Sequence, residues 1–142
     1  MYDDVLVPTD GSDASAAAVE QGIAIADGES ATVHFLHVID LGTEMSAAGG
    51  SIAEELTETL EREADEALDA AARTAESTGA AYDRTTVEGV PHEAIAEHVD
   101  EHDVDLVVMG ASGRTGLKEH LLGSTADRVV RSVETSVLLA RP

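Results

Sequence analysis

The pattern of hydrophobic and polar residues divides this chain into strand-like and helix-like segments that alternate along the sequence. Runs of branched apolar residues, typical of strands covered on both faces, occur at 5–7, 31–39, 105–109 and 136–140, and a more alternating run occurs at 81–88. Between them, apolar residues recur at helical spacing over about 13–26, 51–78, 92–102 and 124–133. The expected order is β-α-β-α-β-α-β-loop-α-β.

This regular alternation predicts a single α/β domain over residues 1–142, with a parallel sheet, helices on both faces and right-handed crossovers. In such sheets, ligands bind beyond the carboxyl ends of the strands, where the strand order reverses. Two loops, Pro8–Ser12 and Gly110–Ser124, would meet there if the first and fourth strands were neighbours. The spacing does not reveal the strand order.

Residues at the segment ends predict where the helices begin and stop. Ser12 or Asp13 can cap the first helix, and Asp27–Gly28 is expected to end it. Gly79 should end the long helix, and Pro91 should begin the next one. Ser124 is expected to cap the last helix, with Asp127 completing a capping box and Val129, Val130 and Val133 facing inward.

The glycine loop that follows the fourth strand carries the main candidate chemistry. Closely spaced glycines let the backbone approach a ligand, and the start of the helix adds unpaired N–H groups, so this loop favours phosphate binding. The spacing Gly110-x2-Gly113-x9-Gly123-Ser124 matches neither the dinucleotide fingerprint nor the P-loop. Arg114 and Lys118 can screen phosphate charge. The alternative interpretation is a flexible, solvated surface loop.

Charge narrows the choice of ligand. The net charge is −21, and the acidic residues are spread along the chain, which is typical of a halophilic protein; an ordinary acidic cytosolic protein is the alternative. Residues 110–142 nevertheless hold five of the eight basic residues and only three of the 29 acidic ones. This distribution suits a polyphosphate, whereas nucleic-acid binding would need a basic stripe that is missing here.

Other compositional features exclude several classes of function. The chain has no cysteine, which rules out disulfides and thiolate metal sites. It shows no signal peptide and no apolar run long enough to span a membrane, so a cytoplasmic location is expected. His98 and His102 have the spacing of two ligands on one helix face, but no third ligand is evident, and solvated surface histidines are the preferred interpretation.

Two residues at the ends of the first two strands have alternative roles. Asp10 can accept hydrogen bonds from a ribose or an adenine amino group, or it can simply form the turn before Gly11. Val38 can pack against a base or belong to the core.

The chain resembles the ATP-binding branch of the universal stress protein family along nearly its whole length. The similar stretches are Val5-Leu-Val-Pro-Thr-Asp-Gly-Ser12, Leu36-His-Val-Ile-Asp40, Asp105-Leu-Val-Val-Met-Gly110, the glycine loop and Ser136-Val-Leu-Leu139. The resemblance implies a five-stranded Rossmann-like parallel sheet of order 3-2-1-4-5, and a homodimer formed through the last strand, Ser136 to Ala140. Gly116 is a departure from many relatives that should loosen the loop.

The resemblance also implies a ligand site for ATP. Pro8, Thr9, Asp10 and Val38 would hold adenine and ribose. Ribose and phosphates would be held by Met109, Gly110, Gly113, Gly123, Ser124 and Thr125, with Arg114 nearby and with Mg²⁺ or Mn²⁺ bridging the phosphates. The expected function is a nucleotide-responsive regulatory module in stress response. The alternatives are a slow ATPase or nucleotide hydrolase, for which no general base is evident near the loop, and a nucleotide-free dimeric scaffold.

Overall fold

The computed structural model describes residues 1–42, 53–112 and 122–142. Its sheet consists of β1 (Asp4–Pro8), β2 (Thr32–Ile39), β3 (Tyr82–Glu88), β4 (Leu106–Gly110) and β5 (Ser136–Ala140). Its helices are α1 (Asp13–Glu29), α3 (Ala53–Thr78), α4 (Pro91–Glu101) and α5 (Ser124–Ser132). All neighbouring strands are parallel, and their order is β3-β2-β1-β4-β5, which confirms the expected fold.

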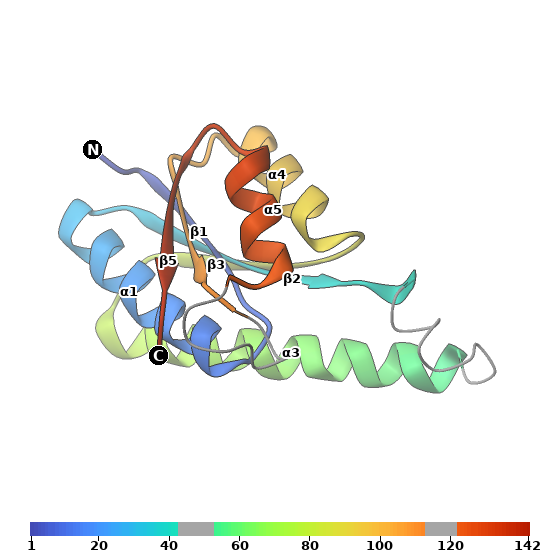
Figure 1. Cartoon of the computed structure of the whole chain (residues 1–142). Coiled ribbons are helices and arrows are strands. Elements are labelled where there is room, and N and C mark those ends of the chain that lie inside the picture. The colour runs from blue at the N-terminus through green and yellow to red at the C-terminus, as the bar shows by residue number, and fades with distance from the viewer. Residues whose placement is uncertain (43–52, 113–121) are drawn as a thin grey trace.

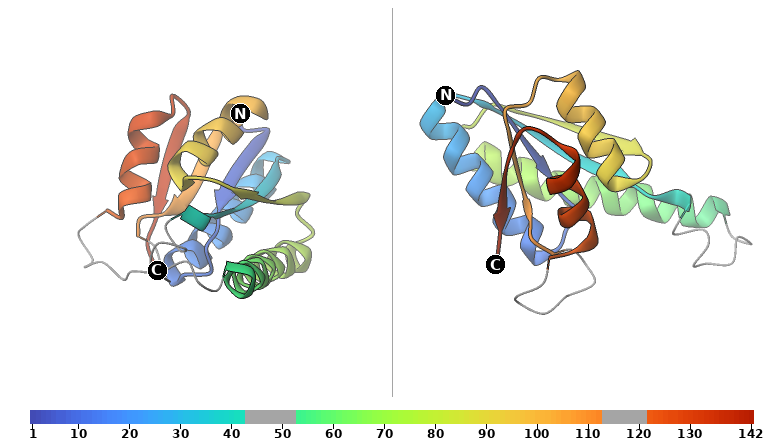
Figure 2. Two further views of the ribbon diagram at one scale, coloured as in Figure 1. Left: turned by 90° about the vertical axis from the view of Figure 1, so that its right-hand side faces the viewer. Right: turned by 45° about the horizontal axis from the view of Figure 1, so that its top comes forward.

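The sheet lies between two helical layers, with α1 and α3 on one face and α4 and α5 on the other (Figures 1 and 2). Successive residues of a strand point to opposite faces, so a strand covered on both sides needs apolar residues at every position. In β1, Val5 and Val7 join the core beneath α1 and α3, whereas Leu6 joins the core beneath α4 and α5. All three are fully buried, which explains the unbroken apolar run in the sequence.

The ends of α1 and α3 only partly follow the sequence prediction. Ser12 caps α1, with its hydroxyl accepting from the Ser15 amide at 3.2 Å, and Gly79 follows α3 with a φ of 76°, as expected. The prediction that Asp27–Gly28 ends α1 is wrong, because the helix continues to Glu29 and ends at Ser30, which adopts a left-handed φ of 56°. The Ser30 amide bonds the Ala26 and Asp27 carbonyls and so closes the last turn.

Three predictions for α5 are also wrong. The N-cap is Gly123, whose carbonyl accepts from the Asp127 amide at 3.0 Å, so Ser124 is the first helical residue and not the cap. The Asp127 carboxylate pairs with Arg131 at 3.2 Å and is part of no capping box with Ser124. Val130 is 45% exposed, because the narrow buried stripe of this short helix is filled by Ala126 and Val129.

The carboxyl ends of β1 and β4 form the switch point of the sheet. These strands are neighbours, but β1 leads into α1 on one face and β4 leads toward α5 on the other. Diverging connections leave a crevice at this edge, which is where ligands bind in doubly wound folds. None of the helices in the described ranges has both the length and the apolar character that crossing a bilayer requires.

Candidate functional site

A cavity of about 250 Å³ lies at the carboxyl ends of β1, β2 and β4, beside the first turn of α5. Its walls come from five separate stretches of the chain. The lining residues are Pro8, Thr9, Asp10, Ser15, Leu36, Val38, Pro91, Ile95, Met109, Gly110, Ser112, Gly123, Ser124, Thr125 and Ala126.

The structure brings together most of the residues that the sequence analysis assigned to a site. Nine of them line the cavity, namely Pro8, Thr9, Asp10, Val38, Met109, Gly110, Gly123, Ser124 and Thr125. Gly113 and Arg114 lie outside the described residues. Segments more than 100 residues apart in the sequence therefore meet at one edge of the sheet, and the roles of these residues toward a ligand remain predictions.

The loop after β1 is held by several hydrogen bonds. The buried Thr9 donates its amide to the Leu36 carbonyl at 2.8 Å, and its hydroxyl lies 3.3 Å from that of Ser15. Asp10 accepts from the Ser12 amide at 2.9 Å, so it does form the turn. Asp10 also lines the cavity, so forming the turn does not exclude its predicted role toward a ligand.

Gly110, at the end of β4, has a packing role that the sequence did not reveal. A Cβ on Gly110 would lie 2.8 Å from the Ala14 Cβ and 2.9 Å from the Ala14 carbonyl carbon. Only glycine therefore lets the first turn of α1 approach the end of β4 this closely. Ser15 of α1 and Gly110 both line the cavity, so this close approach shapes the part of the site where the two elements meet.

Backbone hydrogen bonds hold the start of α5 beside the end of β4. The Gly123 amide donates to the Ala111 carbonyl at 2.7 Å, and the Ala111 amide donates to the Ala140 carbonyl at 2.9 Å. These two amides are therefore committed to the protein. The first-turn amides of α5 remain as candidate anion donors, since a helix cannot pair them internally and the Gly123 cap has no side chain to do so.

Some lining residues were missed by sequence reasoning. Pro91 and Ile95 belong to α4, and their apolar spacing identified them only as a helix start and a core position. Leu36 and Ala126 were likewise unremarkable apolar residues. Val38 is half-buried and lines the cavity, and with the other lining residues of the contacting elements β2 and α4 it makes one side of the site apolar. No local signal distinguishes such residues from ordinary core.

Histidines away from the cavity have structural contacts. His34 lies near the amino ends of the strands, with Nε2 2.8 Å from Asp4 and Nδ1 2.8 Å from Asp83. Burial opposes protonation of this ring, but hydrogen bonds to the two carboxylates outweigh it and raise the pKa of His34. Burial, together with the nearby His102 and His34, lowers the pKa of His98.

The prediction that His98 and His102 are solvated surface histidines is wrong for His98, which is only 8% exposed, because it lies on the inner side of α4. The two rings stack with their centroids 4.1 Å apart at the carboxyl end of α4, the end of that helix farther from the cavity-lining Pro91. No group of three potential metal-ligating residues is found within the described ranges.

A doubly wound parallel sheet with a cavity at its switch point defines a Rossmann-like α/β fold, and in such folds the switch point is the usual place for a ligand. The chain belongs to the universal stress protein family, which it matches over residues 1–141. It is 36% identical to the universal stress protein MJ0531 of Methanocaldococcus jannaschii, an alignment that covers 99% of this chain and 83% of that protein.

Solved structures agree with this assignment. The hypothetical protein MJ0577, also of M. jannaschii, is 32% identical and superposes with a TM-score of 0.86, covering 100% of this chain and 97% of its own. A universal stress protein in complex with cAMP is 30% identical, with a TM-score of 0.68 and coverage of 99% and 97% of the two chains. Membership of the universal stress protein family is thereby confirmed, whereas the ATP-binding branch and the halophilic character stay predictions.

Proposed function

We propose that this chain binds an adenine nucleotide in the switch-point cavity and acts as a nucleotide-responsive regulatory module. The observation that carries the proposal is the convergence on one cavity of an apolar wall and a helix N-terminus, from segments distant in the sequence. A flat apolar base and a charged phosphate tail need these two environments side by side.

The apolar side suits the base. Val38 and Ile95 line the cavity with hydrocarbon, and Asp10, which follows the end of β1, lines the same cavity. Asp10 would accept hydrogen bonds from the ribose or the adenine amino group, while Pro8 and Thr9 bound the same wall. This half of the site would hold the nucleoside.

The polar side suits the phosphates. Gly110 and the first turn of α5, from Gly123 to Thr125, present backbone and hydroxyl groups to the cavity. The region 110–142 is also the least acidic part of the chain. ATP is the proposed nucleotide, with Mg²⁺ or Mn²⁺ bridging its phosphates. The relative of known structure bound to cAMP supports an adenine nucleotide as the ligand class.

Binding without rapid hydrolysis fits the lining better than an enzyme does. Among the lining residues that the structure describes, Asp10 is the only carboxylate and no histidine is present. One oxygen of Asp10 already accepts from the Ser12 amide. The described lining residues therefore offer no well-placed pair of groups for activating water.

The exposed edge of the sheet supports a dimer as part of this proposal. β5 is an edge strand, and Val137, Leu138 and Leu139 are only half-buried. Such an edge can pair with a second copy across a twofold axis. Light scattering should give the mass of a dimer, whereas Leu138→Lys should give that of a monomer. A wild-type monomer at high protein concentration would contradict the dimer.

A pair of substitutions at Ser124 tests the phosphate site. Ser124 is the first residue of α5 and follows an extended Gly123 (φ −64°, ψ 154°), a setting that accepts proline. Ser124→Pro removes an amide donor without breaking the helix, whereas the control Ser124→Ala removes only the hydroxyl. In calorimetric titrations of Mg²⁺–ATP at molar salt, we expect the proline variant to bind about tenfold more weakly than the alanine variant. Absence of ATP binding to the wild type would refute the proposed function.

A further inference from the structure

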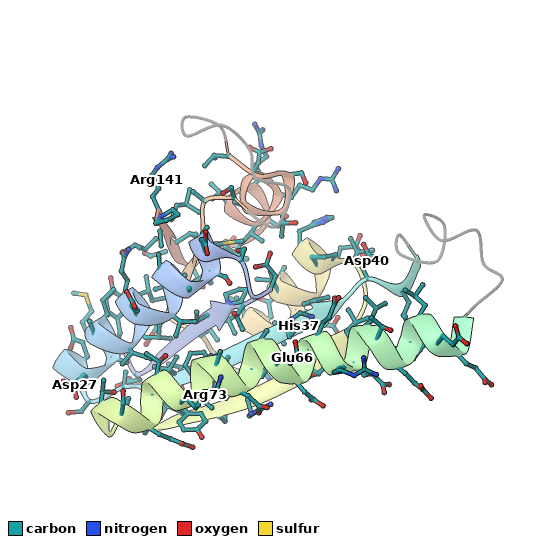
Figure 3. The ribbon with its side chains drawn as sticks, turned by 90° about the horizontal axis from the view of Figure 1, so that it is seen from below. Asp27, His37, Asp40, Glu66, Arg73 and Arg141 are labelled. Carbon is teal, nitrogen blue, oxygen red and sulfur yellow. The ribbon has the colours of Figure 1, made fainter. Side chains whose placement is uncertain are left out.

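His37 is a buried histidine that does not line the cavity and yet contacts the loop that does. It is 8% exposed and lies on β2, between Leu36 and Val38, which both line the cavity. Alternate strand residues point to opposite faces, so His37 lies on the face of Phe35, which packs beneath α1 and α3. Figure 3 shows His37 from the side of the sheet that α3 covers.

The His37 ring is hydrogen-bonded to the backbone where the chain leaves β1. Its Nδ1 lies 2.8 Å from the Thr9 carbonyl oxygen. A carbonyl only accepts, so Nδ1 carries the hydrogen and donates. On the other side of the same residue, the Thr9 amide donates to the Leu36 carbonyl at 2.8 Å. Both polar backbone groups of Thr9 are therefore bound by β2, one by its backbone and one by its side chain.

This double attachment fixes the peptide that precedes Asp10. β1 ends at Pro8, so Thr9 and Asp10 lie beyond the regular strand. The Thr9 carbonyl belongs to the peptide plane that joins Thr9 to Asp10, and holding that oxygen limits rotation of the plane. The direction in which the Asp10 carboxylate enters the cavity thus depends on a side chain on the opposite face of the sheet.

We propose that His37 is a positioning residue for the nucleoside half of the site, acting through the Thr9 carbonyl and Asp10. The inference rests on the proposed nucleotide function. The α5 amides on the phosphate side are held by a different set of bonds, which run from Gly123 through Ala111 to β5. Loss of the His37 hydrogen bond should therefore weaken nucleoside binding and leave phosphate binding unchanged.

Two substitutions isolate the hydrogen bond. His37→Phe keeps a ring of similar shape and removes the donor. His37→Asn returns an N–H at the position of Nδ1, because both nitrogens are bonded to Cγ. The same change at an exposed histidine, His102→Phe, controls for histidine loss. Circular dichroism and thermal unfolding establish which variants are folded.

The binding experiment uses two probes, adenosine and inorganic tripolyphosphate, measured by calorimetry against each variant. We expect His37→Phe to weaken adenosine binding about tenfold, with tripolyphosphate affinity unchanged and with adenosine affinity restored in His37→Asn. Unchanged adenosine affinity in His37→Phe would overturn the proposal. Equal loss of both probes, or failure of His37→Asn to restore adenosine binding, would also overturn it.

A measurement without ligand separates this proposal from the proposed function. Amide hydrogen exchange at Thr9 and Ser12 reports the two bonds that flank the held peptide, to Leu36 and Asp10 respectively. Both amides should exchange about tenfold faster in His37→Phe than in the wild type. Unchanged exchange would overturn the positioning role. If the wild type bound neither probe, the proposed function would fail, and the exchange result would decide the role of His37.

Discussion

Replacing Gly22 by alanine should destabilise the protein even though alanine is the better helix former. Gly22 is buried in α1, and a Cβ at this position would lie 2.6 Å from the Val7 Cγ2 atom. Carbon atoms in favourable contact are about 3.5–4.0 Å apart, so this contact would be about 1 Å too short. Val7 is fully buried and β-branched, which leaves it no easy alternative rotamer.

The expected magnitude combines two opposing effects. A glycine-to-alanine change in a helix interior stabilises by about 0.5–1 kcal/mol, whereas overpacking a filled core costs about 1–3 kcal/mol. The midpoints of these ranges give an expected net loss of about 1 kcal/mol in the free energy of unfolding, and the upper limit is about 2.5 kcal/mol. Gly28 provides the matched control, because it lies in the same helix and a Cβ there would meet nothing within 4 Å. Gly28→Ala should stabilise by about 0.5–1 kcal/mol.

Urea unfolding at constant salt measures these differences, with the m-value confirming that the unfolded state is unchanged. Val7→Ala provides a further test, since it removes the methyl group that a Cβ on Gly22 would meet. In the double variant, the cost of Gly22→Ala should shrink by at least about 1 kcal/mol. A clash between residue 22 and Val7 is refuted if Gly22→Ala raises the free energy of unfolding as much as Gly28→Ala does. It is also refuted if the losses of stability caused by Val7→Ala and by Gly22→Ala are additive in the double variant.

Four further outcomes are expected. Gly110→Ala should lower the free energy of unfolding by about 2–3 kcal/mol, because its Cβ would meet the backbone of Ala14. It should also weaken ATP binding. A variant with the wild-type free energy of unfolding and the wild-type ATP affinity in calorimetry would contradict this prediction. The pKa of His34 is raised above 6.5 in the folded state, so its contribution to stability is present below pH 6.5 and is lost as pH rises through that folded pKa. The difference in free energy of unfolding between the wild type and His34→Gln, measured with urea from pH 6 to 9, should decrease as the pH rises. A difference that does not change with pH would contradict this prediction. The pKa of buried His98 is lowered below 6.5, so the wild type should lose stability relative to His98→Phe as the pH falls below 6.5. Urea unfolding of both proteins over this pH range measures the effect. An equal loss of stability in both would contradict the lowered pKa. Finally, the net charge of −21 predicts a Tm that rises steeply with KCl as the Debye length shrinks from about 10 Å at 0.1 M to about 3 Å at 1 M; a Tm independent of salt would refute a halophilic character.

The glycine loop shows how far local signals reach in the candidate site. The sequence placed Gly110 and Gly123 at a strand end and a helix start, and both line the cavity. It could not show that Gly110 is required for contact with Ala14, or that Gly123 and not Ser124 caps α5. Each of these depends on where another segment lies, and periodicity contains no such information.

The sequence alone determined the succession of elements and the parallel α/β class, because the periods of apolar residues in strands and helices are set by local backbone geometry. The strand order came from the family resemblance and not from the spacing. Only the tertiary structure decided that Pro91 and Ile95 of α4 enter the cavity and that His37 holds the Thr9 carbonyl from the opposite face. These contacts join residues that are distant in the chain, and they form only when the sheet brings its strands and helices together.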